Sequence, residues 1–408
     1  MVSMYFFPFG FTFLPSNINS KNLCAFLGFI TAVFDGVRHN KISVNKPLLG
    51  AILIVTVYSI IGYIAIDINN TNDTSYANYF VSFSVWSFGA YFACSVIKRV
   101  HGIVNIRLIT MYLAGIGFSQ CVLAYLINSI PAFKSFVNLF IDQGQSFLDE
   151  IGRWYGIGAA LDPAGVRFCI IVILIAAVLT RDSIVRSKKS YIFYLVICFF
   201  TIVLIGNIIS RTTTIGSVLA LVYILLNGGL LKTIIKVEAF KFYFIFGGLT
   251  LLTIFLGIYL YNNDPMFHKN LRYGFEGFFN WIETGEWTTG STEKLNNEMW
   301  IWPTTDKAWL IGTGYFDGWI YSTDIGYCRL ILYNGLIGFS VFASFFVYNA
   351  LVFMNYYSKY IQIFLIFIVL TFVIWIKVST DIYQIWAMLY MITLLNPNEL
   401  KNENSLLH

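Results

Sequence analysis

Long apolar stretches follow one another along almost the whole chain, and they constrain the fold more than any other feature of the sequence. A helix that crosses a membrane needs about 20 mainly apolar residues. Eleven runs approach or exceed that length, at 22–37, 46–67, 76–97, 105–130, 163–180, 190–210, 212–228, 241–261, 325–354, 360–377 and 382–396. We therefore predict an all-α, polytopic integral membrane protein.

The composition supports a membrane location and excludes several classes of protein. Hydrophobic residues make up 58% of the 408 residues and charged residues only 12%. Soluble domains contain about 45–50% apolar and about 25% charged residues. So little charge cannot cover the surface of a soluble enzyme, a nucleic-acid-binding module or a disordered chain of this length. The six cysteines show neither zinc-binding nor disulfide spacing, so we expect no metal site and no cofactor.

The first apolar segment, 2–17, is short and contains Pro8 and Pro15. We interpret it as a kinked first span, which gives about twelve transmembrane helices. A secretory signal is the alternative, but the segment lacks a basic beginning. With the N-terminus in the cytoplasm, alternation places 15 cations and five acids inside, and 11 cations and 16 acids outside. This asymmetry follows the positive-inside rule, so we expect both termini to be cytoplasmic.

Two outer loops interrupt the predicted single membrane domain, 1–408. The first outer loop covers 131–162, and the large outer loop covers 262–324. Loops of this length are usually functional. No internal repeat relates the two halves of the chain, which disfavours transporter folds built from duplicated bundles.

Three tryptophans, Trp300, Trp302 and Trp309, lie in the middle of the large outer loop beside acidic residues. Trp and Tyr often form a belt at the membrane surface. Because these three lie far from the loop ends, we favour a folded subdomain or a platform for sugar rings. Acids in the same loop could accept hydrogen bonds from sugar hydroxyls, although a solvated loop surface is their simpler explanation.

Arginines near the outer ends of the spans suggest an anionic ligand. Arg211 separates two apolar runs in IGNIISRTTTIGSVLAL, with hydroxyl-bearing neighbours on both sides. Its guanidinium offers a bidentate fork for phosphate oxygens. Arg153, Arg167 and Arg329 lie near other outer span ends, where snorkelling to the interface is the alternative explanation. His268 is the one histidine on the outer side, and an ordinary surface role is its simpler explanation.

Several short patterns combine with this layout. They are the Ser210-Arg211 hairpin, Arg153-x-x-Gly156 followed by Asp162-Pro163, and the stretch Gly312-x-Gly314, Asp324-x-x-Tyr327, Gly335-x-x-Gly338. Together they resemble the O-antigen polymerase (Wzy) and O-antigen ligase superfamily of bacterial polysaccharide assembly. Ligases of that superfamily typically carry a histidine where this chain has Asp324, which favours a polymerase. An O-antigen ligase and, from another class, a polysaccharide flippase or other membrane transporter are the alternatives.

The resemblance implies a metal-independent glycosyltransferase in the bacterial inner membrane, with its active site facing the periplasm. Such an enzyme transfers the growing glycan from undecaprenyl diphosphate to a new lipid-linked repeat unit, for polysaccharide of the O-antigen or capsule type. The expected partners are undecaprenyl-diphosphate-linked glycans and membrane lipid, with a chain-length regulator and a flippase as further candidates. No nucleic acid is expected.

The resemblance also implies roles for individual residues. The cations assigned to the diphosphate are Arg211, Arg153, Arg329, Arg167 and Arg272. The candidate catalytic residues are Asp324 and His268. The residues assigned to sugar binding are Trp300, Trp302, Trp309 and Tyr327. Asp324 has a second possible role as the N-cap of the helix that follows it.

Overall fold

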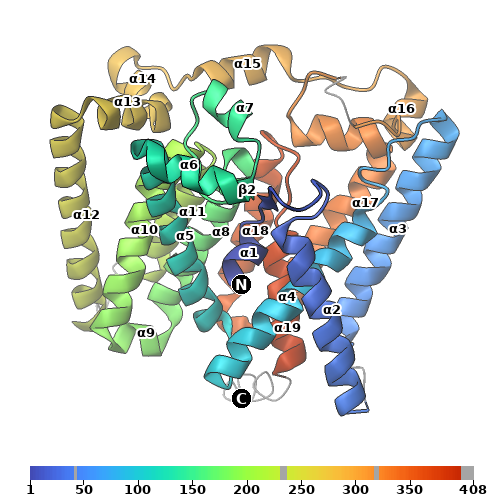
Figure 1. Ribbon diagram of the computed structural model, residues 1–408, viewed down its shortest axis with the longest axis horizontal. Coiled ribbons are helices and arrows are strands. Elements are labelled where there is room, and N and C mark those ends of the chain that lie inside the picture. Colours follow the sequence, from blue (N-terminus) through green and yellow to red (C-terminus); the bar gives the residue numbers. More distant parts are fainter. Residues whose placement is uncertain (41–43, 230–236, 317–320, 397–408) are drawn as a thin grey trace. The chain divides into compact units, whose positions relative to one another are not determined.

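The structure is a computed structural model that describes residues 1–40, 44–229, 237–316 and 321–396. Within these ranges it is almost wholly helical, with two short strands (Figure 1). The predicted all-α class is therefore confirmed. The expected single membrane domain is made of two compact units: residues 1–21 with 105–288, and residues 22–104 with the chain from 289 onward.

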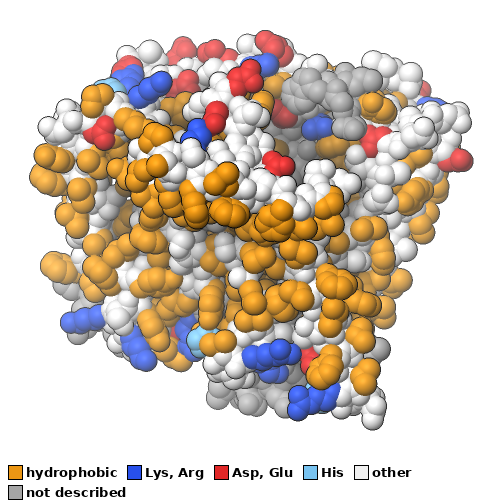
Figure 2. Space-filling view, viewed as in Figure 1, with side chains coloured by type: hydrophobic (Ala, Val, Ile, Leu, Met, Phe, Trp, Pro, Cys, Tyr) orange, Lys and Arg blue, Asp and Glu red, His pale blue; other side chains and the backbone are white. Residues whose placement is uncertain are grey.

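The helices identify a membrane-embedded protein. Within the described ranges, eight helices are long and apolar enough to cross a membrane: α2, α3, α4, α5, α8, α10, α12 and α17. The helices α11, α18 and α19 are shorter and also apolar. Each of these eleven helices begins and ends within a few residues of one of the apolar runs predicted to span the membrane. Figure 2 shows hydrophobic side chains along the sides of the helices and charged side chains toward helix ends.

The first unit contains the described helices between residues 105 and 288, together with the short elements at the start of the chain. Its elements are α1 (Val2–Phe6), β1 (Gly10–Phe11), α5 (Ile106–Ser129), α6 (Pro131–Phe140), β2 (Ile141–Asp142), α7 (Gln145–Glu150), α8 (Leu161–Arg181), α9 (Ser183–Ser187), α10 (Lys189–Ile209), α11 (Thr213–Asn227), α12 (Val237–Asn263), α13 (Pro265–Gly274) and α14 (Glu276–Thr284).

The second unit combines an early and a late part of the chain. Its elements are α2 (Ser20–Arg38), which begins at the boundary with the first unit, α3 (Lys46–Asn69), α4 (Tyr79–His101), α15 (Gly290–Glu298), α16 (Asp306–Ile311), α17 (Gly326–Tyr356), the 3-10 turn η1 (Ser358–Tyr360), α18 (Ile361–Ile374) and α19 (Tyr383–Leu395).

The helix α8 is the centre of the first unit. From Ala164 to Thr180 its side chains are buried, with Arg167 as the exception. It packs against α5, α10 and α11. A helix that is apolar on every face can be buried all round only when neighbouring helices surround it. Its first turn is consequently fixed beside the turn between α10 and α11.

The segment 2–17 does not form the kinked first span that we predicted. The helix α1 has only five residues, or about 7.5 Å at about 1.5 Å per residue. A span must cross about 30 Å of hydrocarbon. Tyr5, Phe6 and Phe7 are fully buried within the unit, and Pro8 prevents the helix from continuing. The apolar residues at the start of the segment therefore pack against protein.

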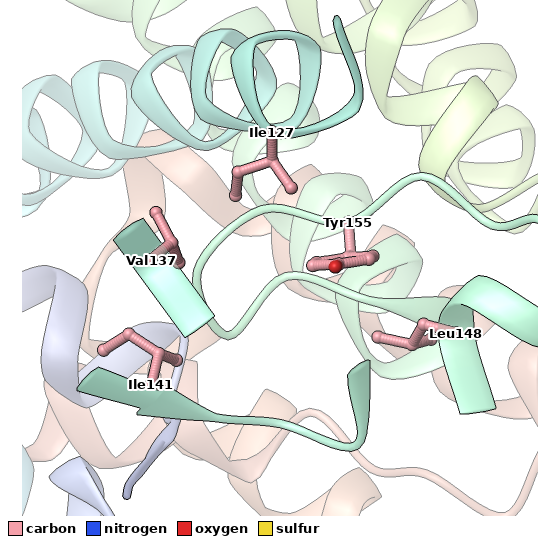
Figure 3. Close-up of a cluster of buried hydrophobic side chains, with 5 residues drawn as sticks. All are labelled: Ile127, Val137, Ile141, Leu148 and Tyr155. Atoms are coloured by element: carbon pink, nitrogen blue, oxygen red, sulfur yellow. The ribbon is translucent and has the colours of Figure 1, made fainter. Parts of the chain in front are cut away.

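The first outer loop is folded onto this N-terminal segment. The strand β2 pairs antiparallel with β1, and Thr12 donates to the Leu139 carbonyl at 2.7 Å. Five buried side chains point toward one another beneath the loop: Ile127, Val137, Ile141, Leu148 and Tyr155 (Figure 3). Since the loop has its own apolar core, it can hold Arg153 in a fixed position.

Candidate functional site

The turn that carries Arg211 is fixed by the start of α8. Asp162, in the first turn of α8, accepts hydrogen bonds from the hydroxyls of Ser210, at 3.2 Å, and Thr212. Gly165 lies so close to the turn that a Cβ there would be 2.5 Å from the Ser210 hydroxyl oxygen. These hydroxyls therefore hold the turn from which Arg211 extends.

Residues at the junction of α13 and α14 contact Arg211. Its guanidinium forms an ion pair with Glu276, the first residue of α14. Its Cζ atom lies 4.7 Å from the centroid of the Tyr273 ring. The junction comes this close because Gly274 packs on the backbone of Asn207, where a Cβ would lie 3.3 Å from the carbonyl carbon. Arg211 therefore has both a carboxylate and an aromatic face as partners.

Arg153 lies over the same tyrosine. Its Cζ atom is 4.5 Å from the Tyr273 ring centroid. Burial, and after it the positive charge of Arg211, lower the pKa of the Arg153 guanidinium, while Asp162 and Glu276 act in the opposite direction. Among the described residues, no carboxylate lies within ion-pair distance of Arg153. This cation is partly removed from water without a direct counter-ion.

The ring between the two arginines has an unused polar group. The Tyr273 hydroxyl oxygen is buried and has no hydrogen-bond partner among the described residues. A buried polar group without a partner costs about 1–3 kcal/mol, so such groups are rare unless something else binds them. We call Arg153, Arg211, Tyr273 and Glu276 the arginine–tyrosine cluster. Its two guanidinium groups face the Glu276 carboxylate, with Asp162 acting on Arg153 from nearby, and planar guanidinium groups suit an oxyanion.

Arg272 and His268 belong to a separate group in the same unit. Arg272 forms an ion pair with Glu283 at 2.8 Å, and its Cζ atom lies 5.0 Å from the Phe279 ring centroid. That hydrogen-bonded pair raises the pKa of Arg272 and lowers the pKa of Glu283. The His268 ring stacks on Tyr261, with 4.0 Å between centroids. These contacts hold α12, α13 and α14 together.

Arg167 extends from the second turn of α8. Its Cζ atom lies 5.8 Å from the centroid of the Phe7 ring. The side chain is half-buried in a helix whose other residues from Ala164 onward are buried. Arg167 thus faces the N-terminal segment. It lies on α8, the helix whose first turn contains Asp162.

Arg329 belongs to the second unit, where aromatic residues surround it. Its Cζ atom lies 3.6 Å from the Phe316 ring centroid, and its guanidinium donates to the Phe316 carbonyl at 2.8 Å. The Phe316 amide in turn donates to Asp73 at 2.6 Å. Arg329 therefore fastens the end of the large outer loop onto α17 and onto the segment between α3 and α4.

Asp324 is exposed and lies two residues before α17. The N-cap position of α17 is occupied by Ile325, and no side chain caps the helix there. Thr323, which is buried, instead accepts a hydrogen bond from the Ile325 amide at 3.1 Å and donates to the Met299 carbonyl at 2.6 Å. The N-cap position of α17 thus falls on Ile325 and not on Asp324, whose side chain is exposed.

The three tryptophans predicted to act together form a continuous stack. Trp302 lies between the others, 5.7 Å from Trp300 and 5.7 Å from Trp309 between ring centroids, and the Trp302 and Trp309 planes differ by only 17°. Trp300 is 41% exposed and Trp302 is 37% exposed. Tyr327 is placed differently, because its hydroxyl donates to the Phe372 carbonyl at 3.0 Å and its ring packs on Trp375.

Three glycines of the pattern at 312–338, Gly312, Gly314 and Gly335, have a structural role. The helix α17 is kinked at Gly335, whose φ of 63° and ψ of −174° are not helical. The kink leaves carbonyl oxygens available, so Thr313 donates to Leu332 at 2.7 Å and Gly314 donates to Tyr333 at 3.0 Å through their amides. A Cβ on Gly312 would lie 2.2 Å from the Tyr333 oxygen. These glycines bring the end of the large outer loop into contact with the broken helix.

Sequence reasoning missed Tyr273 and Glu276. Both follow Arg211 by more than sixty positions, and neither belongs to a recognisable pattern. The only available signal was the position of Glu276 at the start of a short amphipathic stretch, which is too common to identify a site. No known protein family, characterised protein or solved structure matches this chain.

Proposed function

We propose that this protein is a polymerase that joins undecaprenyl-diphosphate-linked oligosaccharide repeat units into a polysaccharide at the outer face of the bacterial inner membrane. The observation that carries this proposal is the arginine–tyrosine cluster. Arg153 and Arg211 share one aromatic ring, and only Arg211 has a carboxylate partner among the described residues. Preorganised cations of this kind stabilise negative charge that develops on a leaving group.

In the proposed reaction, a hydroxyl of the acceptor repeat unit attacks the anomeric carbon of the donor glycan. A new glycosidic C–O bond forms, and the bond from the anomeric carbon to the diphosphate oxygen breaks. The bonding electrons leave with undecaprenyl diphosphate, whose charge Arg153 and Arg211 neutralise. The hydroxyl proton passes to a base, for which we propose Asp324, because its side chain is exposed beside the start of α17.

For the acceptor sugars we propose the tryptophan stack. A row of partly exposed indole rings offers a flat apolar face with polar edges, which matches the CH-rich face of a sugar ring. Trp300, Trp302 and Trp309 provide three such rings in sequence. We do not extend this role to Tyr327, because its hydroxyl and ring are already used in packing against α18 and the residue that follows it.

The short helix α1 changes the topology that we propose. Counting the eight long helices and the three shorter apolar helices gives eleven crossings. The chain then enters the membrane through α2 from the outer side and ends in the cytoplasm. The basic ends of α2, α4 and α8 face the cytoplasm in this arrangement, as the positive-inside rule requires. The large outer loop faces the periplasm.

The decisive experiment uses purified protein in lipid vesicles. The substrate is the lipid-linked repeat unit extracted from a strain that lacks this gene, supplied without ATP, sugar nucleotide or ion gradient. We expect a ladder of lengthened lipid-linked glycans. If the repeat units stay single, the polymerase proposal fails. If they cross the bilayer unchanged, the protein is a flippase. If polymer moves only onto a lipid A-core acceptor, it is a ligase.

A further inference from the structure

A long groove lies in the second unit, and none of the candidate site residues named above lines it. It encloses about 1350 Å³ between α2, α3, α4 and α19. The helix α4 contributes residues from Phe80 to Arg99, at the three- and four-residue spacing of a single helix face. At about 1.5 Å per residue, this face extends about 29 Å. The groove therefore follows almost the whole length of a membrane-spanning helix.

Its lining changes from apolar to basic along that length. Phe80, Phe83 and Phe88 line it within α4, and Leu48 and Ile52 line it from α3. At the other end it is lined by Arg38, in the last turn of α2, and by Lys98 and Arg99, in the last turn of α4. Helix ends mark the level at which a span leaves the hydrocarbon. The basic end of the groove thus lies at the level of lipid headgroups.

The cations at this end outnumber the acids. Asp35 is the one acidic residue among the described lining residues, and it accepts a hydrogen bond from the Tyr91 hydroxyl at 2.8 Å. Lys98 donates to the Leu395 carbonyl at 2.5 Å. Within the described part of the chain, Arg38 and Arg99 have no carboxylate at ion-pair distance. Both are exposed, so their charges are available to a headgroup.

We propose that this groove binds an anionic phospholipid. One acyl chain lies along the face of α4 between Phe80 and Phe88, and the phosphate is held by Arg38 and Arg99. Basic pockets between transmembrane helices are recognised by acidic headgroups, and each cation contributes about 1 kcal/mol near an anionic lipid, which is about fivefold in affinity. This site is independent of the proposed polymerase activity, and its basic end lies at the last turns of α2 and α4.

The test measures lipid retention by native mass spectrometry. Purified protein is mixed with phosphatidylglycerol or with phosphatidylcholine of the same acyl chains. We expect the wild type to retain one phosphatidylglycerol in preference to phosphatidylcholine. The double variant Arg38→Gln/Arg99→Gln should lose about 30-fold of that preference. Its matched control, Lys188→Gln/Lys189→Gln, removes two exposed cations outside the groove and should behave as wild type.

A second pair of variants tests the acyl-chain part of the groove. Ser84 lines the groove, and its hydroxyl donates to the carbonyl four residues earlier at 2.8 Å. Ser119 makes the same type of bond at 2.8 Å on the exposed face of α5. Ser84→Trp should fill the groove and abolish retention of both lipids, whereas Ser119→Trp should leave retention unchanged.

Three results would overturn the proposal. One is equal retention of the two lipids by the wild type. Another is unchanged retention by Ser84→Trp. The third is displacement of phosphatidylglycerol by millimolar inorganic phosphate, which would indicate a simple anion site. The unfolding midpoint of each variant is measured in parallel, and Ser84→Ala, which keeps the groove open, should retain lipid if Ser84→Trp fails to fold.

Discussion

Arg153 and Arg211 place their guanidinium groups 4.5 and 4.7 Å from the centroid of one ring, that of Tyr273. Two like charges this close repel each other, and the Tyr273 ring offsets part of that repulsion through cation–π attraction. Glu276 forms an ion pair with Arg211. A bound anion would relieve the remaining repulsion and would also stabilise the folded protein by mass action.

The first prediction concerns the shape of these two cations. Arg153→Lys and Arg211→Lys keep the charge but lose the planar fork that binds two phosphate oxygens at once. We expect each variant to polymerise repeat units about 10²–10³-fold more slowly, as when a donor to a developing oxyanion is removed. The rate is measured as repeat units added per minute by the reconstituted protein.

Arg186→Lys is the matched control, because Arg186 lies in the short helix α9 between spans. It should polymerise at the wild-type rate. If Arg211→Ala, at normal protein levels, gave polymer of normal amount and length, the role of the cluster in the reaction would be refuted. If the lysine variants still bind the lipid carrier, then they have kept the charge that binding needs and have lost only the planar guanidinium fork.

Much of the fold could be predicted because apolar runs set the span positions directly. The error at 2–17 has a physical cause. An apolar segment avoids water, but its sequence does not show whether lipid or the protein interior surrounds it. Phe6 and Phe7 are buried by protein. The site was predictable only in part, since contacts such as Arg211 with Tyr273 join distant segments. The grouping of Trp302 with its neighbours was predictable because they are close in sequence.

The second prediction concerns the tryptophan stack. Trp302 contacts the other two rings, so Trp302→Ala should disrupt the whole platform. An aromatic contact contributes about 0.5–1.5 kcal/mol, so we expect the KM for the acceptor repeat unit to rise roughly tenfold, with kcat little changed. Trp281→Ala is the control, because Trp281 is 53% exposed and lies outside the stack. An unchanged KM in Trp302→Ala would exclude the stack as the acceptor site.

The third prediction separates the two roles considered for Asp324. Asp324→Asn keeps the size of the side chain but cannot take up a proton at neutral pH. Because asparagine caps a helix as well as aspartate does, this variant should accumulate normally and unfold at the wild-type temperature under either role. We expect it to lose polymer formation by at least the 10²-fold typical of a general base. Asp306→Asn, in the first turn of α16, is the control. Wild-type polymerisation by Asp324→Asn would leave the base to another residue.

The fourth prediction concerns topology. All six native cysteines are buried, so a single introduced cysteine can be labelled against a low background. Ser291 and Ser187 are both exposed. Ser291→Cys should react with a membrane-impermeant maleimide in intact spheroplasts, and Ser187→Cys should react only after lysis. Labelling of Ser187→Cys in intact spheroplasts would contradict the proposed arrangement.

The fifth prediction concerns the kink in α17. Gly335 has a combination of φ and ψ that only glycine adopts readily. A Cβ there would also lie 2.2 Å from the Leu310 carbonyl oxygen. Gly335→Ala should therefore either straighten the helix or separate it from the end of the large outer loop. We expect a loss of at least about 1–3 kcal/mol in stability, together with faster proteolysis of the loop.

Gly247→Ala is the matched control for this change, because Gly247 lies within α12 and a Cβ there would meet no atom within 4 Å. Alanine is favoured over glycine inside a helix by about 0.5–1 kcal/mol, so this variant should be as stable as the wild type or slightly more stable. Thermal unfolding in detergent and limited proteolysis compare the two variants directly. If Gly335→Ala unfolded and was cleaved like Gly247→Ala, then the kink would not be what holds the loop on α17. The contact between Arg329 and Phe316 would then be the remaining candidate for that role.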